Sequence, residues 1–215
     1  MSDDPVPLLG RTERKREAIL AAATALFLRN GFHGTSMDEV AAGAAVSKQT
    51  VYKQFVDKER LFREIVQGVS GNSDGIVATI TTAFGQQAAT TPDELERRLT
   101  RVARAYLDGV LQPQVLALRR LIIAEAEQFP DLARAYYDTA PARGIDLIAD
   151  RLAPYVESGL LVVRDDLRLA AAHLAYLALA VAQDRAMFAP TDLPSTRERN
   201  RLARAAARVF LAAYG

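Results

Sequence analysis

Cysteine is absent from this chain of 215 residues, and histidine occurs only twice, as His33 and His173. Without cysteine the chain forms neither a disulfide framework nor a thiolate metal site. The two histidines lie far apart in the sequence and do not make a metal cluster. We therefore expect no metal and no cofactor.

Catalytic and nucleotide-binding motifs are missing as well. The sequence contains no GxGxxG, GxxxxGKS/T, HExxH or GxSxG pattern, and these patterns mark the common nucleotide, zinc and nucleophile sites. The acidic pair Asp165-Asp166 consists of adjacent residues rather than residues spaced across a cleft, so we interpret it as solvated. We therefore expect that the protein is not an enzyme.

Long hydrophobic runs are also lacking. The apolar stretch LAAAHLAYLALAVA is shorter than the roughly 20 residues that cross a membrane as a helix, and it contains His173. The opening MSDDPVPLLG is too short and too acidic for a signal peptide, and we expect residues 1–10 to form a disordered arm. We therefore expect a cytoplasmic protein without a membrane partner.

A net charge of only +1 hides an uneven distribution along the chain. Residues 11–63 contain ten Lys and Arg against six Asp and Glu, whereas residues 64–215 contain 17 against 18. The positive potential therefore belongs to the front of the chain. A modest surplus on one small domain suits a dimer that meets DNA twice better than a monomer that relies on charge alone.

Two short helices joined by a tight turn are predicted within residues 35–61, TSMDEVAAGAAVSKQTVYKQFVDKERL. Ser36 begins an S-x-x-E capping box, and Ser47 can cap a second helix. Only Ala45 and Val46 separate the two helices, so they must cross steeply. This pattern predicts a helix-turn-helix. The alternative is an ordinary pair of surface helices, because capped amphipathic helices are common.

The second of these helices is rich in hydrogen-bond donors. No acidic residue occurs between Val40 and Val56, which removes repulsion from a DNA backbone. The donors suited to phosphates or bases are Lys48, Gln49, Thr50, Tyr52, Lys53 and Gln54. Lys58 stands at the start of the next predicted helix, where free backbone amides favour a phosphate, so we predict a phosphate contact there. Two interpretations fit the basic residues Arg11, Arg14, Lys15 and Arg16: they contact DNA, or they form a solvated basic turn.

Four segments between residues 16 and 66 resemble the DNA-binding domain of the TetR family of transcriptional regulators. They read R-x-x-I-L-x-A-A-x-x-L-F, G-F-H-G-T-S-M-D-E-V-A, V-S-K-Q-T-V-Y-K-Q-F and D-K-E-R-L-F. The resemblance implies an all-α homodimer with a three-helix DNA-binding domain, here residues 11–66, and a larger helical domain, here residues 67–215, for ligand binding and dimerisation. It also implies a regulator, usually a repressor, that a small molecule releases from a palindromic operator.

The same resemblance implies roles for single residues. The matching DNA-contact positions are Thr35, Lys48, Thr50, Tyr52, Lys53 and Lys58. Gln49 replaces a common glycine, and its amide can make a bidentate contact to adenine, so we predict that it reads a base. Ala45 occupies a turn position where glycine is frequent, and a left-handed backbone there would cost alanine about 1 kcal/mol.

The rest of the chain reads as five or six apolar helices. Thr91-Pro92 predicts one helix start, and six later prolines predict further starts or kinks, at positions 113, 130, 141, 154, 190 and 194. Residues 119–141, RRLIIAEAEQFPDLARAYYDTAP, resemble the C-terminal domain of the AefR-like branch of the family. No stretch alternates as a strand does, although VESGLLVVRDD suits a short extended turn.

Residues 167–188 and 195–214 are rich in alanine and leucine, and they match the two helices that form a four-helix dimer interface in the family. One face of the first segment carries Leu169, His173, Tyr176, Leu177 and Ala180. Core packing is the alternative interpretation. We favour the interface because a monomer of this size rarely needs so much apolar surface on its final helices.

The family's ligand cavity lies between the middle helices and the penultimate one, which implies candidate lining residues by location. They are Tyr106, Leu107, Val110, Leu121, Ile122, Phe129, Tyr136, Tyr137 and, as a polar group, His173. Each also suits a core, and His173 suits an interior or interface position. An apolar or amphipathic effector is favoured. The alternative is an effector-independent or architectural DNA-binding protein, which a cavity of a few hundred Å³ would argue against.

Overall fold

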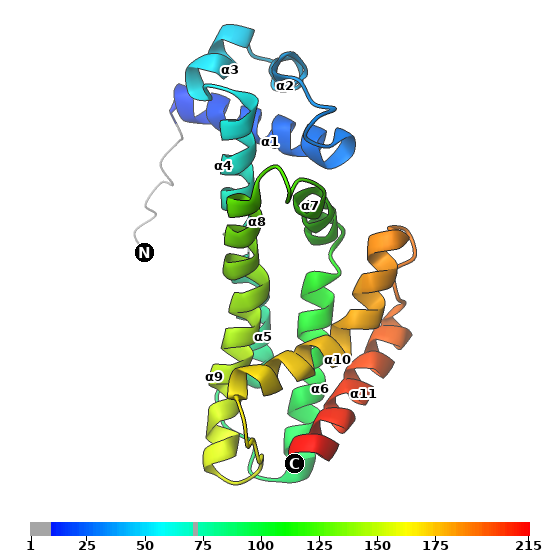
Figure 1. Cartoon of the computed structure of the whole chain (residues 1–215). Coiled ribbons are helices and arrows are strands. Elements are labelled where there is room, and N and C mark those ends of the chain that lie inside the picture. The colour runs from blue at the N-terminus through cyan, green and yellow to red at the C-terminus, as the bar shows by residue number, and fades with distance from the viewer. Residues whose placement is uncertain (1–9, 71–72) are drawn as a thin grey trace, which may run out of the picture.

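The structure, a computed structural model, describes residues 10–70 and 73–215 (Figure 1). These residues form helices and no strand, as expected for an all-α protein. A small N-terminal group of helices stands at one end, and α4 runs from it into a longer body that contains the remaining helices (Figure 1). The arm expected at residues 1–10 lies outside the described residues except for Gly10.

The N-terminal helices confirm the predicted helix-turn-helix. They are α1 (Arg11–Asn30), α2 (Met37–Gly43), α3 (Lys48–Gln54) and α4 (Lys58–Ser70). Ser36 and Glu39 form the complete capping box of α2, and the Ser47 hydroxyl accepts the backbone N–H of Thr50. Asp57 caps α4 in the same manner, because its Oδ1 accepts the backbone N–H of Arg60 at 2.7 Å. The helices α2, α3 and α4 therefore each begin where a side chain accepts an unpaired amide.

The turn between α2 and α3 has left-handed backbone at Ala45, with φ of 52°. Val46 N–H bonds to the carbonyl of Ala41 and Ala45 N–H to that of Ala42, each at 3.1 Å. These two bonds make a Schellman motif, whose left-handed position usually holds glycine. The side chain of Ala45 therefore costs stability here.

We expect Ala45→Gly to raise the free energy of unfolding by about 0.5 kcal/mol, because relief of the left-handed strain exceeds the extra entropy that glycine brings to the unfolded chain. Ala45→Val should lower it, since a branched side chain suits this backbone least. Urea unfolding followed by circular dichroism measures both. A less stable glycine variant would contradict the expectation.

The C-terminal body contains more helices than expected, seven α-helices and a π-helical segment among the described residues. They are α5 (Ser73–Phe84), α6 (Pro92–Val110), α7 (Pro113–Ala124), α8 (Pro130–Tyr137), η1 (Asp138–Ala142), α9 (Arg143–Glu157), α10 (Leu167–Phe188) and α11 (Thr196–Tyr214). Three prolines begin α6, α7 and α8, as predicted. None of the helices in the described ranges is long and apolar enough to cross a bilayer.

Two hydrophobic clusters hold the molecule together. The larger cluster joins α5, α6, α9, α10 and α11 and includes Leu116 of α7. The smaller cluster joins α1–α4 to α7 and α8. Its centre is aromatic, because the ring of Phe129 lies 4.9 Å from that of Phe32 and 5.6 Å from that of Phe62. Segments from the middle of the chain thus complete the core of the N-terminal domain.

Candidate functional site

The helix α3 exposes one polar face. Val51 is fully buried and anchors the opposite face against the domain core. A shallow depression on the exposed face is bordered by Gln49, Thr50, Tyr52 and Lys53. The structure thus brings together four of the residues predicted to contact DNA. A face of amide, hydroxyl and ammonium donors on an exposed helix has the chemistry needed in a major groove.

Lys48, the first residue of α3, pairs with Asp38 of α2. Its Nζ lies 2.8 Å from one carboxylate oxygen and 3.0 Å from the other. The hydrogen bond to Asp38, with the charge attraction that accompanies it, raises the pKa of Lys48. Both side chains are exposed, so a phosphate could compete with Asp38 for this ammonium group.

Thr35 and Lys58 are placed differently from the other predicted DNA contacts. Thr35 is only 2% exposed, and its hydroxyl donates to the carbonyl of Gly31, so its side chain does not reach a surface from this position. Lys58 is half-buried and donates to the carbonyls of Phe32 and Thr35, each at 2.9 Å. Two of its three N–H donors therefore brace the turn before α2.

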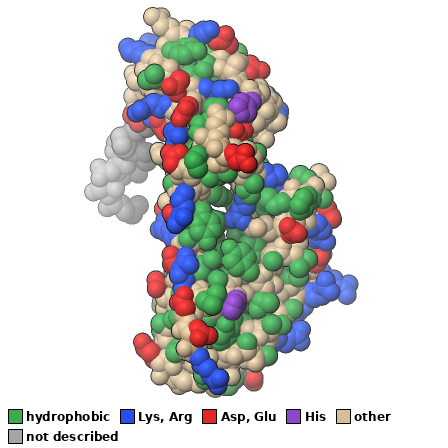
Figure 2. All heavy atoms as spheres, viewed as in Figure 1, with side chains coloured by type: hydrophobic (Ala, Val, Ile, Leu, Met, Phe, Trp, Pro, Cys, Tyr) green, Lys and Arg blue, Asp and Glu red, His purple; other side chains and the backbone are tan. Residues whose placement is uncertain are grey.

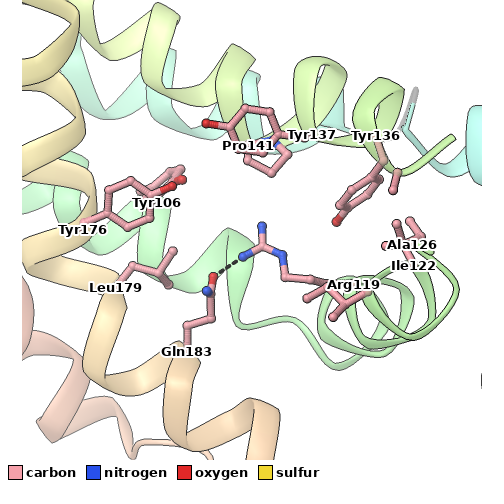
Figure 3. Close-up of a pocket in the computed structure, with 12 residues that line it drawn as sticks. Tyr106, Arg119, Ile122, Ala126, Tyr136, Tyr137, Pro141, Tyr176, Leu179 and Gln183 are labelled. Atoms are coloured by element: carbon pink, nitrogen blue, oxygen red, sulfur yellow. Dashed lines mark hydrogen bonds between the residues drawn. The ribbon is translucent and has the colours of Figure 1, made fainter. Parts of the chain in front are cut away.

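A cavity of about 220 Å³ lies between α7, α8 and α10 (Figure 3). The space-filling view shows a hollow at the waist of the molecule (Figure 2). The residues that line the cavity are Tyr106, Arg119, Ile122, Ile123, Ala126, Ala133, Tyr136, Tyr137, Pro141, Tyr176, Leu179 and Gln183. Most of these side chains are apolar or aromatic, as is usual for small-molecule sites.

The polar groups of the cavity come from separate helices. Arg119 of α7 donates a hydrogen bond to the side-chain oxygen of Gln183 on α10 (Figure 3). Burial raises the pKa of Tyr106 to about 12, and the nearby Arg119 guanidinium opposes only part of that rise. Tyr106 therefore carries a neutral hydroxyl at neutral pH, and Arg119 is the charged group of the cavity.

The predicted ligand residues separate into two groups. Tyr106, Ile122, Tyr136 and Tyr137 line the cavity. Val110 lines a smaller neighbouring space of about 30 Å³, which shares Tyr106 and Arg119 with the larger one. Four other candidates, Leu107, Leu121, Phe129 and His173, are not among the residues that line the cavity.

Phe129 and His173 both lie away from the cavity. Phe129 is 3% exposed in the smaller hydrophobic cluster, because its ring packs on Phe32 of the DNA-binding domain. His173 is exposed on α10, and its Nδ1 lies 2.6 Å from the hydroxyl of Tyr214 on α11. His173 thus joins the last two helices on their outer face.

An apolar surface covers the outer face of α10 and continues onto α11 (Figure 2). Its exposed large side chains are Leu169, Tyr176, Leu177, Val181 and Phe188 on α10 and Val209 on α11. Val181 is 72% exposed and Phe188 is 85% exposed. Contiguous apolar surface of this kind marks an interaction site.

Comparison with protein families assigns both parts of the chain. Residues 19–65 match the family described as bacterial regulatory proteins, tetR family. Residues 97–215 match the family described as AefR-like transcriptional repressor, C-terminal domain. The chain belongs to the TetR family of transcriptional regulators. The TetR-family proteins that it matches are regulators and not enzymes.

Individual TetR-family relatives agree with this assignment. A regulator from Mesorhizobium loti has a crystal structure with a TM-score of 0.83 and 37% identity, over 96% of this chain and 100% of that one. The structure of the flavonoid-responsive regulator FrrA has a TM-score of 0.72 and 29% identity, over 94% of this chain and 97% of that one. UidR of Escherichia coli K12 is 31% identical over 121 residues, and the match covers 48% of this chain and 56% of the UidR chain. The chain spans about half the length of the curated relatives it matches.

Within this TetR-family chain, sequence reasoning missed Arg119, Tyr176 and Gln183 as cavity residues. Tyr176 was assigned to the outer face of its helix, and it reaches both that face and the cavity. The only local signal for Arg119 is a pair of arginines within an apolar stretch, Arg119 and Arg120. Consecutive residues point about 100° apart on a helix, so the sequence does not tell which of them faces inward.

Proposed function

We propose that this TetR-family regulator is a cytoplasmic homodimeric repressor that binds a palindromic operator and is released from it by a small molecule. The observation that carries the proposal is the double role of α7 and α8. These helices line the cavity and also complete the hydrophobic core of the DNA-binding domain. A ligand that displaces them must therefore disturb the support of that domain.

DNA binding is assigned to the exposed face of α3. We propose that Lys48, Thr50, Tyr52 and Lys53 contact the DNA and that Gln49 reads a base. In this proposal Lys58 keeps one N–H donor for a phosphate, while Thr35 takes part only through the turn that it helps to build. Two such helices in a dimer would enter successive major grooves about 34 Å apart.

Dimerisation is assigned to the apolar surface of α10 and α11. A surface that leaves Leu177, Val181 and Phe188 open to water is unfavourable in a monomer. The same face on a second copy would cover it through a two-fold axis, which makes the interface self-complementary. The small residues that the two helices carry let partner helices approach closely.

The release step follows contacts between α8 and the DNA-binding domain. Arg63 of α4 binds Asp131 of α8 through two hydrogen bonds, at 2.5 and 3.3 Å, and its guanidinium lies 5.4 Å from the centre of the Phe129 ring. A shift of α8 would thus move α4 and alter the spacing of the two recognition helices. The ligand lowers DNA affinity only by its differential binding to the two states. Equal ligand affinity for the free and the DNA-bound protein would refute this mechanism.

The comparison proteins support a ligand-responsive regulator. FrrA is described as flavonoid-responsive, and the C-terminal match is to a repressor family. The cavity of about 220 Å³ favours this proposal over an effector-independent or architectural protein.

Selection of bound sequences from a random DNA pool by the purified protein, at a stated near-physiological salt concentration, tests the proposal first. We expect enrichment of a palindrome whose half-sites lie one helical turn apart. No enrichment by a folded, dimeric protein would reject sequence-specific binding. The selected site then serves as the probe for repressor activity and for effectors.

Two substitutions on α3 separate positioning contacts from base reading. We expect Lys48→Ala to weaken binding to all DNA sequences and to reduce the salt slope by about one unit, since one phosphate contact is lost. Gln49→Ala should instead relax the sequence preference, with little change in the salt slope. Fluorescence anisotropy at several salt concentrations, on the selected site and its single-base variants, measures both effects. If Gln49→Ala behaved like Lys48→Ala, its assignment as a base reader would fail.

A further inference from the structure

The charge of Arg119 is not balanced within the cavity. Arg119 is the one charged residue among those that line it. In the part of the chain that the structure describes, no carboxylate forms an ion pair with it. Its hydrogen-bond partner is the neutral amide of Gln183. Because a guanidinium has five N–H donors, several donors are left for another acceptor.

This guanidinium reaches into the cavity, where a ligand could contact it (Figure 3). Figure 3 shows it reaching into the space that the labelled residues surround, between tyrosine side chains and opposite Leu179. The side chain is half-buried. A cation held among apolar groups without a counter-ion is unfavourable unless an anion joins it. Arginine is also the residue best suited to bind a carboxylate through two parallel hydrogen bonds.

The remaining walls indicate the shape of the ligand. Four tyrosines contribute to them, Tyr106, Tyr136, Tyr137 and Tyr176. Aromatic side chains favour flat, aromatic partners through offset-stacked or edge-to-face contacts. The volume of about 220 Å³ is below the range of roughly 300 to 1,000 Å³ that drug-sized ligands occupy. A compound of one or two fused rings is therefore the appropriate size.

We propose that the cavity binds a small aromatic monocarboxylate, with the carboxylate on the Arg119 guanidinium and the ring system between the tyrosines. This inference rests on the proposed function, because it names the effector class of the same cavity. Arg119 is thus the residue that determines specificity for an anion. A tyrosine-lined space would by itself also suit an organic cation, but the positive guanidinium repels that class.

The proposal also explains how such a ligand would act. The Arg119–Gln183 hydrogen bond joins α7 to α10, 64 positions apart in the sequence. A carboxylate on the remaining Arg119 donors would pull this guanidinium toward the ligand, and the ring of the ligand would separate α8 from α10. Both effects bear on α7 and α8, which support the DNA-binding domain.

Calorimetric titration of the full-length protein, without DNA, tests this inference with three probes of one shape. The probes are 2-naphthoate, neutral 2-naphthamide and cationic 2-naphthylmethylammonium. We expect 2-naphthoate to bind at least about 10-fold more tightly than the amide, because charge-assisted hydrogen bonds are lost in the amide, and we expect no binding of the ammonium compound. Equal affinities for acid and amide, preference for the cation, or binding of none of the three would overturn the proposal.

Two matched variants locate the anion contact. Arg119→Gln should weaken 2-naphthoate binding by at least about 10-fold and leave the weaker binding of 2-naphthamide unchanged. Arg120→Gln removes the same charge one residue along α7, where the guanidinium donates to the carbonyl of Ala186 outside the cavity, and should preserve the preference for the acid. Wild-type affinity of Arg119→Gln for 2-naphthoate would reject the assignment.

The outcome can be separated from that of the proposed function. Operator selection uses the protein without any ligand, and the calorimetric titration uses the protein without DNA. A palindromic operator together with no preference for 2-naphthoate would leave the regulator intact and reject the ligand class. A clear preference for 2-naphthoate together with no enriched operator would support the ligand class and reject sequence-specific DNA binding.

Discussion

Val181→Glu is expected to convert the proposed dimer into a folded monomer and to reduce its affinity for a palindromic operator by about 100-fold or more, because two linked half-sites gain that much from simultaneous binding. Val181 is 72% exposed on the apolar face of α10, so the substitution creates no cavity within the protomer. Across a two-fold interface, a carboxylate at this position would meet either the same carboxylate of the second copy or apolar side chains. Burying the charge there is unfavourable. The protomer itself should keep its stability.

Mass photometry or analytical ultracentrifugation, combined with DNA-binding measurements, checks this expectation. Ala78→Glu is the matched control, since it adds the same charge at an exposed site of α5, a helix that packs on α6 and α9. The control should remain dimeric and bind the operator normally. A dimeric Val181→Glu protein with full operator affinity would show that the α10 face is not the interface.

Phe129→Ala is expected to lower the free energy of unfolding by about 3 to 5 kcal/mol, the range for truncating a buried phenylalanine. Phe129 is almost fully buried and contacts Phe32 and Phe62, so its removal leaves a cavity where α8 meets the DNA-binding domain. The loss is large compared with the roughly 5 to 15 kcal/mol that stabilises a typical domain. The variant should also weaken the link between the cavity and the recognition helix.

Urea unfolding monitored by circular dichroism measures this loss. Phe129→Leu serves as the control, because it retains most of the buried volume and should cost much less. Since Phe129 does not line the cavity, Phe129→Leu should bind 2-naphthoate as the wild type does while its DNA release is weakened. Wild-type stability of Phe129→Ala would contradict the packing described for this ring. Loss of ligand affinity in Phe129→Leu would instead show that Phe129 contributes to the ligand-binding site.

Local chemistry made much of the fold predictable. The capping box of Ser36 and Glu39, the cap at Ser47 and the left-handed turn at Ala45 involve groups within a few residues of one another, so the sequence displays them directly. Prolines at the first positions of α6, α7 and α8 are local signals of the same kind. Even the full extent of α10 could be predicted from its composition.

The expected number of C-terminal helices was too small, for a physical reason. The helices α7 and α8 are short, and η1 continues from α8 into α9 through Pro141. Short helices depend on tertiary packing more than on their own propensity. The points where these short helices end are therefore weakly encoded in any local window of sequence.

The sequence by itself determined the helix-turn-helix, the polar face of α3 and membership of a DNA-binding family, because capping, turn geometry and helical periodicity all act over a few residues. Only the tertiary structure decided that Arg119 faces Gln183 in a cavity, that Phe129 completes the core of the DNA-binding domain, and that the Thr35 side chain is buried. These placements join residues far apart in the chain. They depend on how the helices pack together, which no local pattern of residues specifies.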